Sequence, residues 1–369
     1  MATLSQAAPL TLESPVGQIQ RGDPLARLLA QWRVGPLAAT LVAAAYGALH
    51  ALALPALYGH LGTVAGVQGA LDDWPSLVVI LLMAPLVVGY YVWQPTIIQA
   101  TYAGIAARVG KNPAATAQGA ELLRPLGWPV WAPLAGAIAI LECSWWIHDQ
   151  IFVSSLYWEN ANALMIVSLQ PLRFLTFYIL VLIIIRQAVI LLGLNRFFAQ
   201  FSVEIQPLHP DQAGGLRVLG DYVFTNGLLI AVVGLYFGME LLRARTYGTV
   251  LSLEFLGQIA LYLVAAPAIS ILPLLTVHTR MREAKQKLLA EIAEQFDLEY
   301  RSLLDGLRRD ELKLDEVERL EAIQKIYTIA QSSPEWPFNL GLVSQFAAAI
   351  LLPVLLPLGA NLLGNLLTR

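Results

Sequence analysis

The sequence predicts an all-α, polytopic membrane protein with about seven transmembrane helices, its N-terminus inside and its C-terminus outside. Three observations carry this prediction. A mean hydropathy of +0.61 and a charged fraction of 13% are too apolar for a soluble domain, in which about a quarter of the residues are charged. Seven apolar stretches approach the ~20 residues that cross a ~30 Å hydrocarbon layer. Lys and Arg gather in alternate loops.

The first segment, residues 1–35, is expected to form a cytoplasmic tail with a helix lying in the membrane interface. Pro24 suits a first helical turn after Asp23, and leucines recur at helical spacing from Leu25 to Leu29. The alternative is a polar tail in which this spacing arises by chance.

Apolar spans make up most of the remaining chain. Six of them occupy residues 36–278, and the seventh belongs to the final segment, 332–369. The expected spans lie near 36–58, 75–95, 128–148, 170–194, 222–242, 251–277 and 338–366. We therefore expect a multi-pass protein in the lipid bilayer of a cell membrane, with a prokaryotic inner membrane favoured.

The loops between the spans set the expected orientation. Basic residues occur in the leader and in the second, fourth and sixth loops, and loops that retain Lys and Arg tend to stay inside. The first and third loops carry Asp72, Asp73, Asp149 and Glu159 instead. If these loops converge, they form an acidic outer vestibule that attracts cations rather than anions.

A charged segment, residues 279–331, is expected to form a cytoplasmic helical hairpin between spans six and seven. It holds 10 of the 23 basic and 12 of the 26 acidic residues, and both of its helices keep one apolar face. One interpretation is a solvated hairpin with routine charge pairs four residues apart. The other is that its apolar faces assemble a homo-oligomer or bind a cytosolic protein.

Charged side chains within the spans are the first candidates for a functional site, because each is costly unless it pairs or meets water. Arg186 lies about 15 residues into span four. Glu142 lies in span three, and Arg173, near the outer start of span four, is expected in the same layer. The alternatives are that Arg186 extends its long stem to the cytoplasmic surface, and that these charges form a structural ion-pair network.

Span seven combines amides with prolines and glycines, which is typical of a helix that lines a cavity. Its candidate pathway residues are Gln345, Asn361 and Asn365. The alternative is a kinked helix whose amides only support packing. The layout of spans resembles that of insect chemoreceptor-type ion channels, and Gln345–Phe346 matches the end of that family's last-helix motif. Phe338–Asn339 replaces the Thr-Tyr expected ahead of it, so no residue roles are transferred.

A cytoplasmic elbow is expected before span five, where prolines restrict the chain and a Gly pair permits a tight turn. Its residues are His209, Asp211, Gly214 and Gly215. The alternative is a ligand or gating contact at the same place.

Several functional classes find no support in the sequence. Catalytic and metal-ligand spacings are missing, so we expect no enzymatic activity, no cofactor and no metal site, and an intramembrane enzyme is the least favoured reading. A net charge of −3 without a long basic tract argues against a nucleic-acid partner. The favoured function is a channel or transporter for a small ion or solute, with cations preferred, a pathway near span seven and modulation by the hairpin. The alternative is a membrane scaffold or sensor that docks a cytosolic protein through the hairpin.

Overall fold

The computed structural model describes residues 14–108, 119, 121–152, 158–200, 209, 211, 213–247, 253–308, 314–336, 348, 351 and 355. Within them the secondary structure is helical apart from turns and one isolated bridge between Val64 and Val67. The all-α class predicted from the sequence is therefore confirmed.

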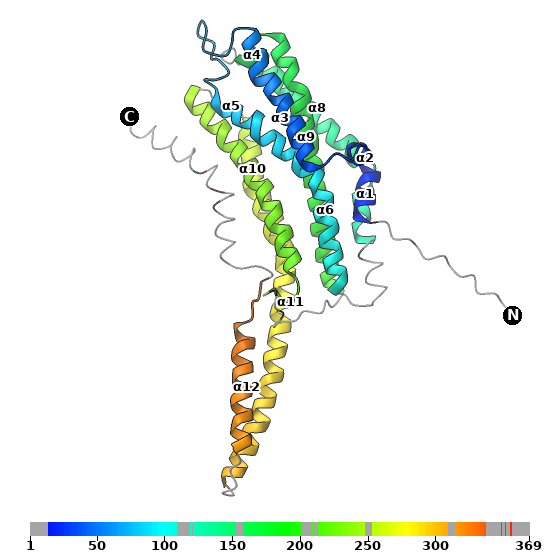
Figure 1. Cartoon of the computed structure of the whole chain (residues 1–369), viewed down its shortest axis with the longest axis vertical. Coiled ribbons are helices and arrows are strands. Elements are labelled where there is room, and N and C mark those ends of the chain that lie inside the picture. The colour runs from blue at the N-terminus through cyan, green and yellow to red at the C-terminus, as the bar shows by residue number, and fades with distance from the viewer. Residues whose placement is uncertain are drawn as a thin grey trace, which may run out of the picture.

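The helices run nearly parallel in one elongated bundle (Figure 1). The main α-helices and the short π-helical (η1, η2) and 3₁₀ (η3, η4) turns follow in chain order as α1 (Pro15–Gly22), α2 (Pro24–Gln31), α3 (Pro36–Ala48), η1 (Leu49–Ala53), α4 (Leu54–Leu57), α5 (Trp74–Val78), η2 (Val79–Met83), α6 (Ala84–Arg108), η3 (Arg124–Gly127), α8 (Trp131–Phe152), η4 (Trp158–Asn160), α9 (Ala163–Gln200), α10 (Arg217–Tyr247), α11 (Leu253–Arg308) and α12 (Leu314–Ser332).

The number of membrane-spanning helices differs from the expected seven. Five helices in the described part of the chain are long and apolar enough to cross a membrane. A sixth span results if the helices Glu121–Gly127 and Trp131–His148, which meet at a bend of 47°, count as one span. Only residues 348, 351 and 355 of the seventh expected span are described, so Gln345, Asn361 and Asn365 lie outside the described residues. The five helices cover Pro36–Leu57, Trp74–Ala107, Ala163–Gln200, Arg217–Thr246 and Leu253–Asp305.

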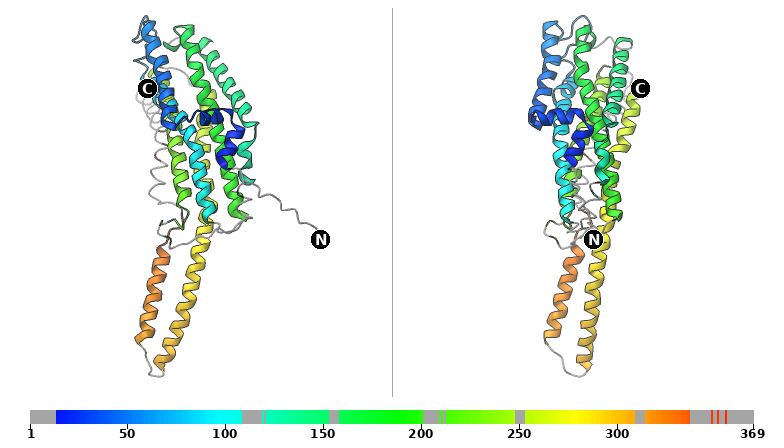
Figure 2. Two further views of the ribbon diagram at one scale, coloured as in Figure 1. Left: turned by 45° about the vertical axis from the view of Figure 1, so that its right-hand side comes forward. Right: turned by 90° about the vertical axis from the view of Figure 1, so that its right-hand side faces the viewer.

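The two ends of the bundle differ. α11, which is 56 residues long, continues beyond one end of the bundle and, with α12, projects as a two-helix hairpin (Figures 1 and 2). We call this the hairpin end and the other the opposite end. α2 runs across the long axis part-way along the bundle (Figure 2), as an interfacial helix would.

Two apolar helices show where α2 and Arg186 lie along the bundle. The helix from α3 to α4, Pro36–Leu57, covers 22 residues and so about 33 Å, which matches the hydrocarbon layer. α2 lies just before Pro36, the first residue of this apolar helix. Arg186 follows Ala163, the first residue of α9, by about 35 Å of helix and lies within the apolar helix Ala163–Gln200. Its contact with Asp23 places it beside the start of α2.

Small residues bring α3 and α6 close together. A methyl group added to Gly89 would collide with Thr40 Oγ1, and one added to Gly47 would collide with the backbone oxygen of Ile80. Such contacts are typical of helix pairs in membranes, where packing rather than hydrophobic burial drives association. A buried apolar cluster around Tyr91, Trp158 and Ile183 extends from this pair to α9.

Candidate functional site

A buried ion pair joins the N-terminal segment to α9 of the bundle. A guanidinium nitrogen of Arg186 lies 2.5 Å from Asp23 Oδ2, and both side chains are 5% exposed. Arg186 also donates to Gln94 Oε1 at 2.9 Å and lies over the ring of Tyr91 at 4.7 Å. We call these residues, with Tyr178, the hairpin-side cluster.

Asp23 is fully occupied by donors. Its Oδ1 accepts the backbone N–H groups of Leu25 at 3.0 Å and Ala26 at 3.2 Å, which caps α2. Tyr91 donates its hydroxyl to Oδ2 at 2.6 Å, and Tyr178 donates to Oδ1 at 3.4 Å. One carboxylate thus balances one guanidinium, and neither cavity described below is lined by Arg186. The sequence marked Asp23 only as a helix cap, so its partnership with Arg186 was missed.

A second polar cluster is formed by the sequence neighbours of Tyr91 and Arg186 together with two residues of α10. Gln187 donates to Asn226 Oδ1 at 2.5 Å, and Tyr90 donates its hydroxyl to the same oxygen. Tyr222 donates to Gln187 Oε1. All four side chains are buried, and we call this cluster the septum. Sequence reasoning did not single out these residues, although Tyr222 and Asn226 lie four apart and so share a face of α10.

A cavity of about 770 Å³ lies on one side of the septum. It is lined by residues of α5, η2, α6, α8, η4, α9, α10 and α11, and Gln187 and Asn226 form part of its lining. Among the described lining residues, four glutamates face two arginines. These charged residues are Glu142, Glu159, Glu240, Glu254, Arg173 and Arg243.

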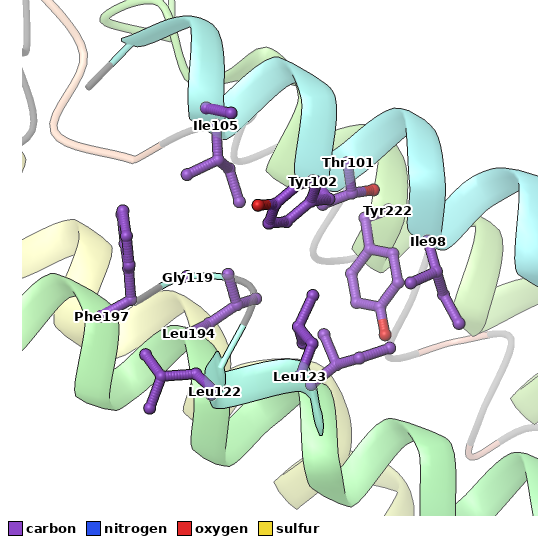
Figure 3. A pocket seen from close by; sticks show the side chains of 13 residues that line it. Ile98, Thr101, Tyr102, Ile105, Gly119, Leu122, Leu123, Leu194, Phe197 and Tyr222 are labelled. Atoms are coloured by element: carbon purple, nitrogen blue, oxygen red, sulfur yellow. The ribbon is translucent and has the colours of Figure 1, made fainter. Parts of the chain in front are cut away.

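A much smaller pocket of about 50 Å³ lies on the other side of the septum. Figure 3 shows the rings of Tyr102 and Tyr222 beside this pocket, among Ile98, Ile105 and Leu123. Because Tyr222 lines the pocket and bonds to Gln187, which lines the cavity, the septum separates the two spaces.

Two carboxylates meet at one amide within the cavity. Gln258 Nε2 lies 2.9 Å from Glu254 Oε1 and 3.3 Å from Glu142 Oε1. Arg173 is held over the rings of Trp146 at 5.0 Å and Phe177 at 5.2 Å, so part of its charge is satisfied by cation–π contacts.

Another cluster of charges lies at the opposite end. One guanidinium nitrogen of Arg243 is 2.7 Å from Asp73 Oδ2 and 3.1 Å from Glu159 Oε2. Glu240 lies 4.0 Å from the other guanidinium nitrogen, and we call these four residues the opposite-end cluster. Asp73 precedes α5, Glu159 belongs to η4, and the other two lie on α10.

The four acidic residues predicted to form a vestibule therefore do not all meet. Asp73 and Glu159 converge on Arg243, but Asp72 accepts bonds from the backbone and hydroxyl of Thr63, each at 2.8 Å. The side chain of Asp149 lies outside the described residues.

The elbow before α10 is built around Asp211. Its Oδ1 accepts the backbone N–H groups of Ala213 and Gly215, each at 3.0 Å, and lies 2.8 Å from His209 Nδ1. Gly214 and Gly215 adopt φ of 64° and 87°, which favours glycine. Burial alone would raise the pKa of Asp211, but these hydrogen bonds outweigh it and hold the pKa below its ordinary value.

The hairpin is anchored where it meets the bundle. Lys285 Nζ donates to the backbone oxygen of Ser333 at 2.9 Å and lies 3.3 Å from Glu335. The ring of His278 stacks on Trp336 at 4.0 Å. These contacts fix the base of the hairpin and leave its outer faces to solvent.

Comparison with family models, curated proteins and solved structures finds no match, so the functional argument rests on this geometry.

Proposed function

We propose that the protein is an integral membrane channel or transporter for a small ion or solute, with cations preferred. In this proposal the pathway enters the cavity between α8, α9, α10 and α11 and is closed by the septum. One observation carries it: a large cavity between apolar helices is lined by acidic and basic side chains and ends at a buried hydrogen-bonded layer.

Hydration explains how the cavity tolerates its charges. At the ~30 Å³ that each water molecule occupies in the liquid, about 770 Å³ holds on the order of twenty-five waters. Intramembrane carboxylates and guanidiniums are tolerated where they pair or face such water, and they mark ion and solute pathways in membrane proteins. The cavity meets both conditions.

The preference for cations follows from the balance of charge. Four glutamates face two arginines, so acidic groups outnumber basic ones in the described lining, and an acidic lining concentrates cations. The septum presents only neutral hydroxyl and amide groups, which can replace part of the hydration shell of a passing cation.

This proposal moves the expected pathway from span seven to the cavity, because Glu142 and Arg173 line a space with other charges. The same proposal places the hairpin in the cytoplasm and gives the protein six or seven spans. This topology rests on the distribution of Lys and Arg among the loops. α11 carries both Gln258 of the cavity and the first helix of the hairpin, so hairpin movements would act on the cavity.

Flux through proteoliposomes tests the proposal. We expect the purified full-length chain to carry Tl⁺ or Rb⁺ into vesicles, as detected by a trapped fluorescent dye or by isotope uptake. Glu142→Gln is expected to reduce this flux by about tenfold or more, since it weakens the attraction for cations in the cavity. Glu121→Gln is the control, because Glu121 is 66% exposed and pairs with Arg124 three residues away.

Two results would overturn the transport proposal. One is the absence of flux for monovalent cations, chloride and small neutral solutes alike. The other is an equal effect of the Glu142 and Glu121 substitutions, which would remove the cavity from the pathway.

One observation favours the second candidate function, a scaffold or sensor. The hairpin leaves Ile326 and Ile329 exposed by 47% and 57% on one face of α12, and Leu298 exposed by 57% on α11. A cytosolic partner would cover such side chains. Ile326→Ser with Ile329→Ser should then abolish the cellular function and leave vesicle flux unchanged, whereas Glu142→Gln should have no cellular effect.

A further inference from the structure

We infer that the opposite-end cluster is a binding site for a monovalent cation, held by Asp73 Oδ1, Ser76 Oγ and the carboxylate of Glu159. This inference deepens the proposed function, on which it rests, by naming the ligand class and its place at the opposite end of the cavity. Ser76, Glu159 and Arg243 line the cavity directly, so a hydrated ion in the cavity has access to the site.

The charge of the cluster is unbalanced. Arg243 faces three carboxylates among the described residues, those of Asp73, Glu159 and Glu240. The charge of Arg173 also acts on Glu240, which leaves Asp73 and Glu159 to share Arg243. Asp73 and Glu159 are 0% and 2% exposed, so water cannot screen their charges as it does at a surface. Burying unmatched carboxylates is costly, and a bound cation removes much of this cost.

Asp73 is turned away from its usual local partners. It precedes α5 at the position where an aspartate normally accepts backbone N–H groups of the first turn, but its side chain makes no such bond. One oxygen, Oδ2, instead pairs with Arg243 at 2.7 Å. The carboxylate is thus held by the cluster rather than by the helix that it begins.

Unused oxygen atoms lie at the same place. Asp73 Oδ1 and Ser76 Oγ are buried, and neither has a hydrogen-bond partner of normal geometry among the described residues. Ser76 is 3% exposed, close to the carboxylate of Asp73, and belongs to the cavity lining. Buried oxygens of this kind are normally satisfied, and a cation that prefers oxygen ligands satisfies both.

The donor set favours a monovalent ion. Within the described residues, no three Asp, Glu, His or Cys side chains are arranged to hold a metal ion by themselves. The guanidinium of Arg243 already occupies one oxygen of each of two carboxylates. The remaining carboxylate and hydroxyl oxygens, completed by water from the cavity, suit Na⁺ or K⁺ rather than a divalent ion.

Cation-dependent thermal stability tests the site directly. The full-length protein in detergent at pH 8 would be titrated with NaCl or KCl against N-methyl-D-glucamine chloride at constant ionic strength. We expect a saturable rise in Tm with Na⁺ or K⁺ only. Ser76→Ala should raise the half-maximal cation concentration about tenfold, as expected for the loss of one ligand interaction.

Asp73→Asn should abolish the cation dependence, and its neighbour Asp72 provides the matched control. Asp72→Asn changes the same charge one residue away, at a side chain bonded to Thr63. The site is overturned if Na⁺, K⁺ and N-methyl-D-glucamine give the same Tm, or if Asp72→Asn acts as strongly as Ser76→Ala. A Tm that responds to pH between 6 and 8 but not to the cation assigns the cluster to proton binding instead and also overturns it.

Flux separates this inference from the function on which it rests. Flux without cation-dependent stability leaves the transport proposal standing and removes the site. Cation-dependent stability that needs Asp73 and Ser76, without flux of any ion or solute, keeps the site and removes transport.

Discussion

Two arginines at opposite ends of the bundle occupy contrasting environments. Arg186 meets one carboxylate, Asp23, whose oxygens are occupied by five donors. Arg243 meets three carboxylates, and one oxygen of Asp73 makes no hydrogen bond of normal geometry among the described residues. The difference separates a structural ion pair from a candidate binding site: charge and acceptors match in the first and not in the second.

The contrast also predicts which substitutions destabilise the folded protein. Breaking a matched buried pair leaves a charge without a partner, which costs more than the pair itself contributes. Removing a carboxylate from a cluster that has more carboxylates than guanidiniums relieves electrostatic repulsion. The same kind of substitution should therefore have opposite consequences at the two ends.

The largest effect is expected at the hairpin-side cluster. Arg186→Met leaves the buried carboxylate of Asp23 unpaired and should destabilise the protein by about 3–5 kcal/mol. The decrease in Tm in detergent measures it. Adding Asp23→Asn should restore a large part of this loss, since the uncompensated charge is removed and the amide oxygen still caps α2. A double variant as unstable as the single one would contradict the matched-pair description.

The septum should give the next largest effect. Asn226→Leu removes the oxygen that accepts both Gln187 and Tyr90, and these buried donors then cost about 1–3 kcal/mol each. Urea or thermal unfolding measures the loss. Tyr222→Phe removes a single donor and should cost less, while raising vesicle flux because the layer loosens. Unchanged flux in Tyr222→Phe would indicate that the layer does not close the pathway.

At the opposite end of the bundle, removing a charge should no longer destabilise the protein. Glu240→Gln removes one excess carboxylate from the cluster around Arg243 and is expected to leave stability within about 1 kcal/mol or to increase it. The measurement is the same Tm, taken without added Na⁺ or K⁺. A loss comparable to that of Arg186→Met would show that the two clusters are energetically alike.

The smallest effect is expected at the elbow. The pKa of Asp211 is depressed in the folded protein, so its stabilisation is present above the ordinary pKa and is lost as the pH falls through the depressed value. Amide hydrogen exchange at Ala213 and Gly215 should therefore accelerate in mild acid relative to the intrinsic rate. Asp211→Ala should show this faster exchange already at neutral pH. Equal protection of these amides in the variant and the unaltered protein would exclude hydrogen bonds from Asp211 as its source.

The sequence was sufficient for the fold class and for several charged positions. Apolar length and composition predict the membrane helices without reference to their neighbours, and this explains why the class was confirmed while the count of seven was not. Arg186 and Glu142 were visible as charges within apolar runs. Their partners were not, because Asp23 lies 163 residues before Arg186 and Gln258 lies 116 after Glu142.

Neutral polar residues were the hardest to recognise. Gln187, Asn226 and Ser76 interrupt apolar helices without a charge, and only the packing of α5, α9 and α10 gives them a role. Arg186–Gln187 and Tyr90–Tyr91 are adjacent polar pairs on two helices, a pattern that indicates two stacked polar layers once these helices are known to touch.

The pairing of Asp23 with Arg186 has a consequence for how the chain is made. The 163 residues between them take about 8–33 s to synthesise at 5–20 residues per second. During that time Asp23 and α2 have been synthesised, but the arginine that pairs with this carboxylate has not. Docking of α1 and α2 is therefore a late event in biogenesis, completed only after α9 has entered the membrane.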